Sequence, residues 1–490
     1  MELTELLPIL MFAALAILLF SGFPVAFVLG GIGLAFAFIA MALDDWLFDW
    51  AQFGAIPGRI FGGIAENLIL TAIPMFIFMG TMLERSGIAR DLLNCLQVLL
   101  RRVPGGLAMA VTLMGTILAA TTGIIGASVV MMSLLALPVM QARGYNPALS
   151  TGTIAASGTL GILIPPSIML VIMADLLSRS VGNLFVAAII PGFMLSGMYL
   201  IYILILCSFR PKLAPKLPAR MGPQDWAAYG IMLLRSFVPP VFLIACVLGS
   251  ILAGLATPTE AAGVGALGAV ILALLNLVLL PGLGVKEMHF EGEAKIDLGT
   301  ADEVRGFGPA FGNFWRTLKD VVVRAALTNA MLFGIFVGAT LFSYVFRALG
   351  GDALVEGFIE HLGLGPWGLL VLLMGIVFFL GFFFDWIEIT LIVLPVFAPI
   401  VEAMDFGDHV AKIEVTYWFA ILLAVNLQTS FLTPPFGFAL FYLKAVAPAD
   451  IKIQQIYKGI IPFVLLQLAG LGLVIAFPEL ALWLPRVLLN

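Results

Sequence analysis

The sequence GTLGILIPPSI, residues 158–168, places two adjacent prolines inside an otherwise apolar stretch. Pro165 and Pro166 lack a backbone N–H and clash with the preceding turn, so a helix that reaches them must break. A second stretch, LQTSFLTPPFGF at 427–438, again places small and hydroxyl residues around two adjacent prolines. The sequence therefore predicts two helices that are interrupted at comparable motifs.

The composition requires a membrane environment. Of the 490 residues, 62% are hydrophobic and 11% are charged, whereas soluble domains carry about a quarter charged residues. The apolar stretches far exceed the ~10 residues of a barrel strand and do not alternate. We therefore expect an all-α integral membrane protein. The net charge of −5 does not suit nucleic-acid binding, and the three scattered cysteines are interpreted as buried small hydrophobic residues.

Twelve apolar segments follow one another along the chain. They are 6–21, 23–42, 60–83, 105–140, 148–178, 184–208, 228–255, 258–281, 321–348, 366–402, 416–446 and 459–484. Three polar segments interrupt them: a basic, proline-rich linker at 209–227, an insertion at 284–320 and an acidic segment at 402–414. Glu2 and Glu5 stand where a signal peptide needs positive charge, so the N-terminal segment is interpreted as a retained membrane segment.

The two halves of the chain are related by an internal repeat. The proline pairs of the two broken stretches align at an offset of 269 residues, and SLLALPVM (133–140) aligns with TLIVLPVF (390–397) at an offset of 257. Both matches occur in the same order, which indicates a duplication. We predict a first repeat at 1–208 and a second at 228–490, joined by the basic linker 209–227.

Two of the apolar segments, 105–140 and 366–402, are too long for one membrane crossing and short for two. Their polar or glycine-rich middles, TTGIIGAS and GFFFDWIEIT, favour re-entrant helical hairpins. Each repeat then has three spans, a hairpin, a broken helix (148–178 or 416–446) and a further span. Five net crossings per repeat predict that the repeats are inverted in the membrane. The basic loops, with the insertion, then face the cytoplasm, and both termini lie on the outer face.

A helix interrupted in mid-membrane exposes free N–H groups at one half-helix end and free carbonyls at the other. Irregular backbone at that depth is tolerated only where it lines a cavity. Carbonyl and hydroxyl oxygens suit a hard cation such as Na⁺, and N–H ends suit an anionic group. The alternative, that each proline pair only kinks a span, is disfavoured by the occurrence of two such motifs at matching positions. Inverted repeats with broken helices are typical of secondary transporters.

Four motifs identify a known family. They are AASGTLGILIPPSIML (155–170), GLATPTEAAGVGAL (254–267), GFFFDWIEITLIVLPVFAPI (381–400) and LLAVNLQTSFLTPPFGFALFYLK (422–444). Outside the insertion, the whole chain resembles the large membrane subunit of tripartite ATP-independent periplasmic (TRAP) transporters. The resemblance implies an elevator-type importer of organic anions (carboxylates) in the inner membrane, with both termini periplasmic and Na⁺ as coupling ion. It also implies two partners, a small four-helix membrane subunit and a periplasmic substrate-binding protein.

The same resemblance implies one ion site between each hairpin tip and the neighbouring break. The implied ion-binding residues are Gly126, Ser128, Ser157, Gly158, Thr159, Pro165, Asp385, Thr390, Gln428, Thr429, Ser430, Thr433 and Pro434. The implied substrate-binding residues are Ser128, Gly161, Pro166, Ser167, Asp385, Glu388 and Pro435. The first tip has fewer hydroxyls than the family's serine-rich cluster. We therefore expect backbone carbonyls to supply more of the ion's ligands at the first site. Glu260, by contrast, is expected to cap a helix.

Alternative functions are weaker. The histidines, His289, His361 and His409, lie in loops on both sides of the membrane, so no buried Ser–His pair can form. The sequence contains neither H-E-x-x-H nor a phosphate-binding G-x-x-x-x-G-K-[ST] loop, so we expect neither an enzyme nor an ATP-driven pump. A channel is harder to exclude, although hairpins that occlude a midplane site suit alternating access better. A stand-alone ion-coupled anion symporter of the same superfamily, without a binding protein, stays open.

Overall fold

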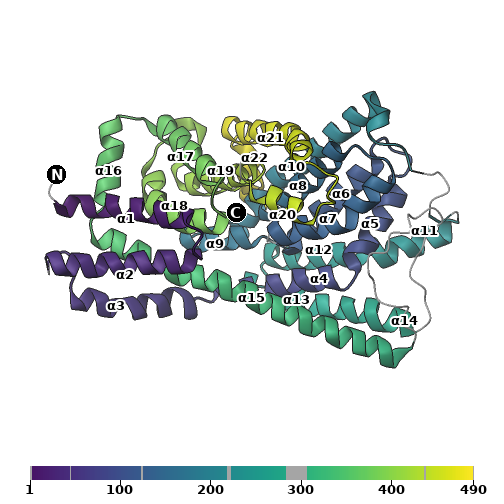
Figure 1. Cartoon of the computed structure of the whole chain (residues 1–490), viewed down its shortest axis with the longest axis horizontal. Helices are drawn as coiled ribbons and strands as arrows, with labels where there is room; N and C mark the ends of the chain where they lie inside the picture. Colours follow the sequence, from purple (N-terminus) through teal and green to yellow (C-terminus); the bar gives the residue numbers. More distant parts are fainter. Residues whose placement is uncertain are drawn as a thin grey trace.

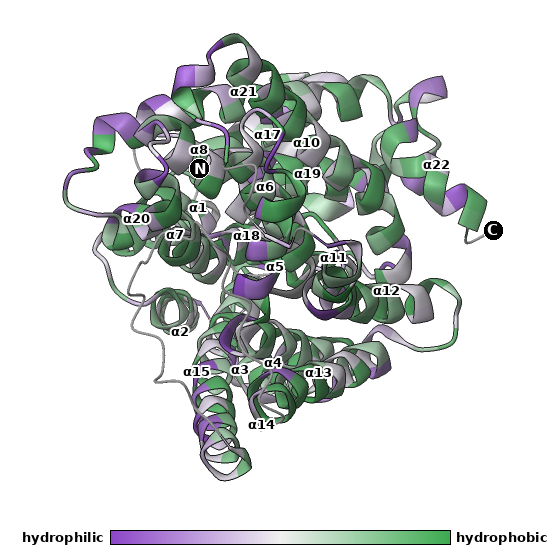
Figure 2. Cartoon of the chain, turned by 90° about the vertical axis from the view of Figure 1, so that its right-hand side faces the viewer, coloured by the Kyte–Doolittle hydropathy of each residue, from purple (hydrophilic) through white to green (hydrophobic). Residues whose placement is uncertain are grey.

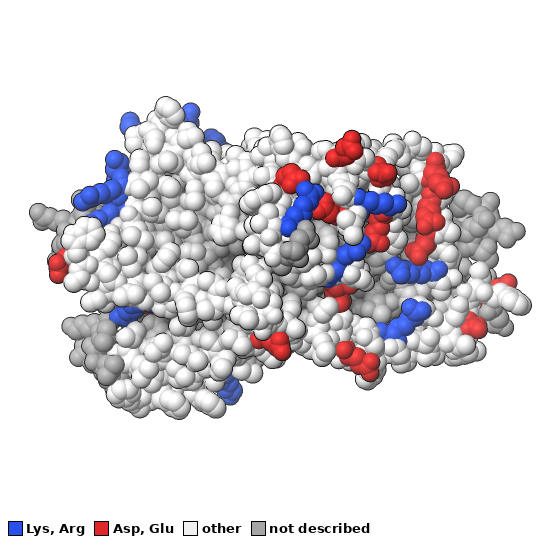
Figure 3. Space-filling view, turned by 180° about the vertical axis from the view of Figure 1, so that it is seen from behind, with Lys and Arg blue, Asp and Glu red and all other residues white. Residues whose placement is uncertain are grey.

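The computed structural model describes residues 3–44, 46–122, 125–217, 222–223, 225–282, 306–434 and 437–488, and these contain helices and no strand. Among them, eight helices are long and apolar enough to span a membrane, and a bent pair adds a ninth candidate. The all-α membrane class predicted from the composition is therefore confirmed. Figure 3 shows a face on which a broad band carries neither acidic nor basic side chains, as contact with lipid requires.

The helices of the first half are α1 (Leu3–Phe20), α2 (Val25–Leu43), α3 (Trp50–Ile60), α4 (Ala72–Arg85), α5 (Ile88–Leu99), α6 (Gly106–Thr122), α7 (Ile125–Ala142), α8 (Pro147–Thr159), α9 (Ile168–Leu176) and α10 (Val181–Phe209). Those of the second half are α11 (Trp226–Met232), α12 (Val238–Leu252), α13 (Pro258–Leu274), α14 (Leu280–Gly282), α15 (Phe307–Ala348), α16 (Gly351–Leu362), α17 (Pro366–Leu380), α18 (Trp386–Ala403), α19 (Val415–Ser430), α20 (Phe438–Val446), α21 (Ile453–Ala476) and α22 (Glu479–Leu488).

The helices form two layers. Seen from the end, α2, α3, α4, α13 and α15 lie together beneath α6, α7, α8, α10, α19, α20 and α21 (Figure 2). The lower layer is organised by α15, whose 42 residues run along much of the long axis of the molecule (Figure 1). At 1.5 Å per residue this helix is about 63 Å long, roughly twice the hydrocarbon thickness of a membrane.

Packing between the two halves is reciprocal. In the lower layer, α2 packs on α15 and α13 packs on α4. In the upper layer, α8 packs on α21 and α19 on α10, while α7 packs on α20 and α18 on α9. In the predicted repeats α2 corresponds to α13, α4 to α15, α8 to α19 and α10 to α21. Each contact between a helix of the first half and a helix of the second is therefore matched by a contact between the two corresponding helices. Two repeats related by an approximate two-fold axis would pack in this way, and their inversion in the membrane stays a prediction.

The interruptions predicted around the two proline pairs are present. The first helix stops at Thr159 and resumes at Ile168, and the second stops at Ser430 and resumes at Phe438. The segments predicted as hairpins correspond to α6 with α7 and to α17 with α18, and the two helices of each pair contact each other. Whether these hairpins re-enter the membrane on one side stays a prediction.

Several predicted boundaries are wrong. The insertion was expected to extend to residue 320, but α15 begins at Phe307, because Ala310, Phe314 and Val321 recur at helical spacing and are buried. Residues 284–305 of the insertion lie outside the described residues. The span expected at 60–83 is a pair of helices bent by 56°.

Other helices lie partly or wholly outside the predicted segments. The short helices α5 and α16 occupy parts of the chain that were expected to connect spans, whereas α11 is the first part of the span predicted at 228–255 and begins slightly earlier, at Trp226. The last predicted span divides at Pro478 into α21 and α22, since the residue before a proline is biased away from the helical conformation. These elements extend the fold without changing the order of the predicted hairpins and breaks.

Candidate ion and substrate site

The two helix breaks meet in the interior of the protein. The Gln428 side chain, at the end of α19, donates from Nε2 to Oγ1 of Thr159, at the end of α8, over 3.4 Å. Both side chains are fully buried. The two residues are 269 positions apart, which is the offset that aligns the proline pairs. Corresponding positions of the two halves are therefore in direct contact at the breaks.

The side-chain hydroxyl groups at the breaks can accept a hydrogen bond or coordinate a cation, because their protons are already donated to backbone carbonyls. Each of these side chains donates to a backbone carbonyl of its own segment: Thr159 to Ala156, Ser167 to Ile162, Thr429 to Val425, Ser430 to Leu427 and Thr433 to Thr429. A hydroxyl has one proton, so once it has donated, its oxygen can only accept. Two further oxygens, Oε1 of Gln428 and Oγ1 of Thr390, are buried and have no hydrogen-bond partner among the described residues. The region is rich in acceptors, as a cation site requires.

The second hairpin places two carboxylates at the start of α18. The Asp385 side chain accepts a hydrogen bond of 2.8 Å from the N–H of Trp386, and Glu388 accepts one of 3.2 Å from the N–H of Asp385. Together they form a capping box that satisfies free N–H groups of the first turn. The acids that the sequence marked as ligands therefore also stabilise the tip of the hairpin.

The tip of the second hairpin touches the second break. A Cβ atom on Gly381, which ends α17, would lie 1.9 Å from Oγ of Ser430. Only the absence of a side chain at Gly381 allows this approach. Just before the break, Asn426 donates from Nδ2 to the carbonyl of Met374 over 2.7 Å and ties α19 to α17. Asn426 was not predicted, although a lone amide in an apolar helix is a usable signal.

The first hairpin approaches the first break in the same manner. A Cβ atom on Gly158 would lie 2.4 Å from Cγ2 of Val129 in α7, and one on Gly126 would lie 2.8 Å from the ring of Tyr442. Tyr442 belongs to α20, so the second broken helix contacts the tip of the first hairpin. Sequence reasoning missed this tyrosine inside the apolar run FALFYLK.

The predicted site residues are mostly buried in one region. Buried residues are Ser128, Ser157, Gly158, Thr159, Gly161, Pro165, Pro166, Ser167, Glu388, Thr390, Gln428, Thr429 and Ser430; partly buried ones are Gly126, Asp385, Thr433 and Pro434. Ser157 donates to Oγ1 of Thr112 in α6 over 3.2 Å. Pro435 lies outside the described residues. The roles of all these residues as ligands stay predictions.

Two observations bear on the other predicted residues. The offset of 257 that aligns 133–140 with 390–397 also pairs Ser128 with Asp385, yet Ser128 lies inside α7 whereas Asp385 precedes α18 as its N-cap. Glu260 caps α13 in a box with Thr257, as predicted. Within the described residues, no group of three His, Cys, Asp or Glu side chains could hold a metal ion. A cation at the breaks would therefore depend on neutral oxygens with at most one or two carboxylates.

Broken helices that meet in the interior of a many-span helical protein are typical of secondary membrane transporters. Residues 12–480 match the family model described as "Tripartite ATP-independent periplasmic transporter, DctM component". The chain belongs to this family, the large permease subunits of TRAP transporters, and is a multi-pass protein of the inner membrane. Several of its relatives are named as transporter permeases, which points to a transporter rather than an enzyme.

Relatives of differing named substrates match most of the chain. The C4-dicarboxylate TRAP transporter large permease protein DctM of Pseudomonas aeruginosa is 29% identical over 422 residues, covering 86% of this chain and 87% of the relative. The sialic acid TRAP transporter large permease protein SiaM of Vibrio cholerae is 26% identical, covering 96% and 97%. The isethionate TRAP transporter permease protein DctMQ of Oleidesulfovibrio alaskensis is 28% identical, and the match covers 97% of this chain but 66% of that protein.

One solved structure has a related fold. The crystal structure of the Alcanivorax borkumensis YdaH transporter matches with a TM-score of 0.55 and 14% sequence identity, covering 89% of this chain and 88% of that one. At this identity the likeness concerns the fold alone.

Proposed function

We propose that this chain is the large permease of a Na⁺-coupled TRAP importer of organic anions, chiefly carboxylates, that works by an elevator mechanism. The observation that supports it best is the meeting of the two breaks at Thr159 and Gln428, where the hydroxyls of Thr159, Thr429 and Ser430 have donated their protons and can only accept. A dehydrated cation needs several such oxygens held in place before it arrives. A small four-helix membrane subunit and a periplasmic binding protein would complete the transporter, and both termini would lie in the periplasm.

The starts of the half-helices differ in whether side chains cap them, and this difference separates the proposed cation site from the proposed substrate site. The start of α18 is already capped by the carboxylates of Asp385 and Glu388, which would repel an anionic substrate. We therefore assign these two residues to the cation and not to the substrate, for which the resemblance also implied them. The starts of α9, at Ser167, and of α20, at Gly437, have no side-chain cap. Their free N–H groups suit a carboxylate. We therefore place the substrate anion at α9 and α20, and a cation between Asp385 and the second break.

This arrangement also gives a reason for coupling. A cation bound beside Asp385 would neutralise the negative charge that faces an incoming carboxylate, so substrate would bind more tightly after the cation. Thermodynamic linkage then makes the cation bind more tightly in the presence of substrate. In the elevator mechanism, the hairpins and broken helices (α6–α9 and α17–α20) form a transport domain that moves with its cargo. The lower layer of α2, α3, α4, α13 and α15 belongs to the scaffold.

The proposal is tested by uptake into liposomes that contain this chain, its small membrane partner and its binding protein. Labelled organic acids are offered with an inward Na⁺ gradient and again with Na⁺ replaced by K⁺. Uptake that needs both Na⁺ and the binding protein supports the proposal. Na⁺-dependent uptake without the binding protein would instead favour a stand-alone symporter, and uptake indifferent to any cation gradient would refute the coupling.

A matched pair of variants locates the cation. Gln428→Leu removes an unpartnered buried acceptor at the break, and we expect the Na⁺ concentration for half-maximal uptake to rise about tenfold, the factor for one good ligand interaction. Gln467→Leu is the control, because Gln467 is an equally buried glutamine on α21 that does not belong to the predicted site. Equal effects of the two variants would mean that buried glutamines matter here for stability alone.

A further inference from the structure

A carbonyl of the second hairpin lacks its partner inside its own helix. In α18, the oxygen of Pro395 would normally accept from the N–H of residue 399, which is also a proline and has none. The donor comes from elsewhere: Arg347, in the last turn of α15, donates from Nη2 to this oxygen. An arginine of the lower layer therefore completes the hydrogen bonding of a hairpin helix in the upper layer.

This feature is confined to the second half of the chain. Under the offset of 257, Pro395 corresponds to Pro138 of α7, and position 399 corresponds to Ala142. Alanine carries an N–H, so the carbonyl of Pro138 has a donor available within α7. The second proline, and with it the need for an outside donor, is specific to the hairpin that carries Asp385.

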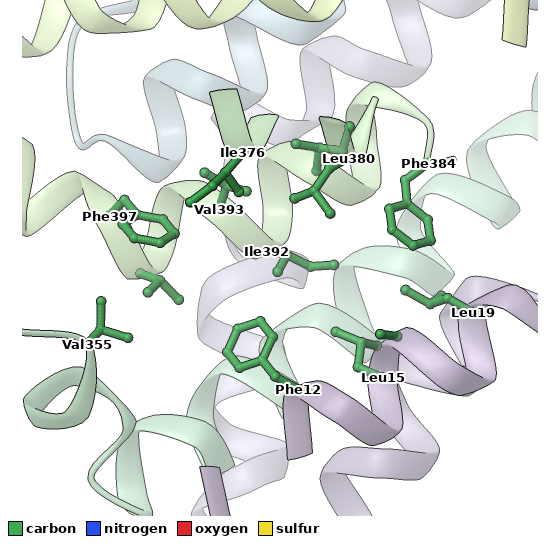
Figure 4. A pocket seen from close by; sticks show the side chains of 13 residues that line it. Phe12, Leu15, Leu19, Val355, Ile376, Leu380, Phe384, Ile392, Val393 and Phe397 are labelled. Carbon is green, nitrogen blue, oxygen red and sulfur yellow. The ribbon is translucent and has the colours of Figure 1, made fainter. Parts of the chain in front are cut away.

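Near this contact, the second hairpin packs against α1 mainly through apolar side chains. Between α1 and the hairpin lies a cavity of about 290 Å³ lined by hydrophobic side chains, among them Phe12, Leu15, Ile392 and Phe397 (Figure 4). Apolar contacts are not directional, so they allow α18 to slide along its neighbours. A hydrogen bond is directional and fixes one position of the helix.

A second polar contact joins the same two layers. The Nδ2 group of Asn67, at the bend before α4, donates to Oδ1 of Asp175 in α9 over 2.6 Å. The end of α9 is tied in turn to α18, since Arg179 forms an ion pair of 2.7 Å with Glu402. Residues from the ends of α9, α15 and α18 line one polar cavity of about 360 Å³. The ends of α9 and α18 are thus linked to each other and attached to the lower layer at two points.

We propose that Arg347 is a latch: its hydrogen bond to Pro395 holds the second hairpin against α15 in the conformation of this structure. The hairpin cannot move along α15 until this bond breaks. The inference rests on the division into scaffold and transport domain proposed above, but it concerns a contact that can be measured without transport.

The test measures how often α18 separates from α15. Ala398 is buried and lines the cavity beside Arg347, so Ala398→Cys, in a Cys246→Ser background that removes the exposed native cysteine, reports separation by its rate of reaction with a water-soluble maleimide. The full complex in liposomes is used. Arg347→Met should raise this rate about tenfold, the factor for one charge-assisted hydrogen bond. Arg347→Lys, which keeps the charge and one donor, should give an intermediate rate.

A matched control and a double variant identify the cause. Arg324→Met removes an arginine from the same helix whose partner, Asp320, also belongs to α15, and it should leave the rate unchanged. Pro399→Ala restores a helical N–H to the Pro395 carbonyl, so adding Arg347→Met to it should change the rate less than twofold.

Two results would overturn the latch. The first is an Arg347→Met rate equal to that of Arg324→Met. The second is an Arg347→Met effect that is undiminished in the Pro399→Ala background, which would mean that Arg347 acts through Asp352, 3.6 Å away, or through its charge. If the labelling depends on Arg347 as expected while uptake proves indifferent to Na⁺, the latch stands and the proposed coupling fails.

Discussion

Replacing Gly381 by alanine tests the contact between the second hairpin tip and the second break. Gly381 ends α17 with φ −66°, a right-handed conformation that alanine adopts without strain, so the substitution isolates a steric effect. The added Cβ would lie 1.9 Å from Oγ and 2.3 Å from Cβ of Ser430, which is fully buried. Non-bonded carbons prefer 3.5–4.0 Å, so the tip and the break must separate by about 1 Å.

The expected cost follows from this displacement. The serine hydroxyl can rotate away only by giving up its 2.8 Å bond to the carbonyl of Leu427, and its Cβ cannot rotate away at all. Overpacking of this kind costs about 1–3 kcal/mol, so we expect Gly381→Ala to lower the free energy of unfolding by about 2 kcal/mol. Adding Ser430→Gly removes the clashing atoms. The double variant should therefore lose less than the two single variants together.

The free energy of unfolding is measured in mixed micelles of mild detergent and sodium dodecyl sulfate. Gly375→Ala is the matched control, because Gly375 lies in the same helix and a Cβ there would meet no atom within 4 Å. Gly375→Ala should therefore not lower the free energy of unfolding. The close approach of tip and break is refuted if Gly381→Ala behaves like Gly375→Ala, or if Ser430→Gly gives no relief in the double variant.

Two further substitutions test other contacts by the same measurement. Gly459→Ala should destabilise by about 2 kcal/mol or more, because its Cβ would lie 2.0 Å from the backbone oxygen of Ala148 where α21 crosses α8, whereas Gly472→Ala in α21 would meet no atom within 4 Å and should be neutral. Thr257→Ala removes the cap that pairs with Glu260 at the start of α13 and should cost about 1 kcal/mol; no loss would mean that water replaces the cap fully.

The helix breaks could be predicted because their cause is local. A proline pair lacks two N–H groups wherever the chain places it, and the repetition of the pair at a fixed offset identified corresponding positions. The capping role of Glu260 was equally local, since it depends on a threonine three residues earlier. Features of this kind need no knowledge of the tertiary structure.

Other features depend on contacts that the sequence does not display. The start of α15 carries Arg316, Lys319 and Asp320 among its aromatic residues, so it was interpreted as a solvated linker, although its apolar residues follow helical spacing and one face is buried. Tyr442 gains its significance only from Gly126, more than 300 positions earlier in the chain. The sequence shows in which segment the start of α15 and Tyr442 lie, but it does not show which residues they contact in the folded protein.

The contact between Thr159 and Gln428 has a consequence for how the site works. Residues at corresponding positions of two related repeats touch each other only near the axis that relates them, so the breaks lie near that axis. The two residues nevertheless differ in type, since a hydroxyl faces an amide. A cation that moved from one break to the other would therefore meet different ligands and a different charge, because the second hairpin carries Asp385 and Glu388, whereas the first hairpin segment, 105–140, contains no Asp or Glu. We accordingly expect two cation sites of unequal affinity, with the tighter one at the second break, where the carboxylates lie.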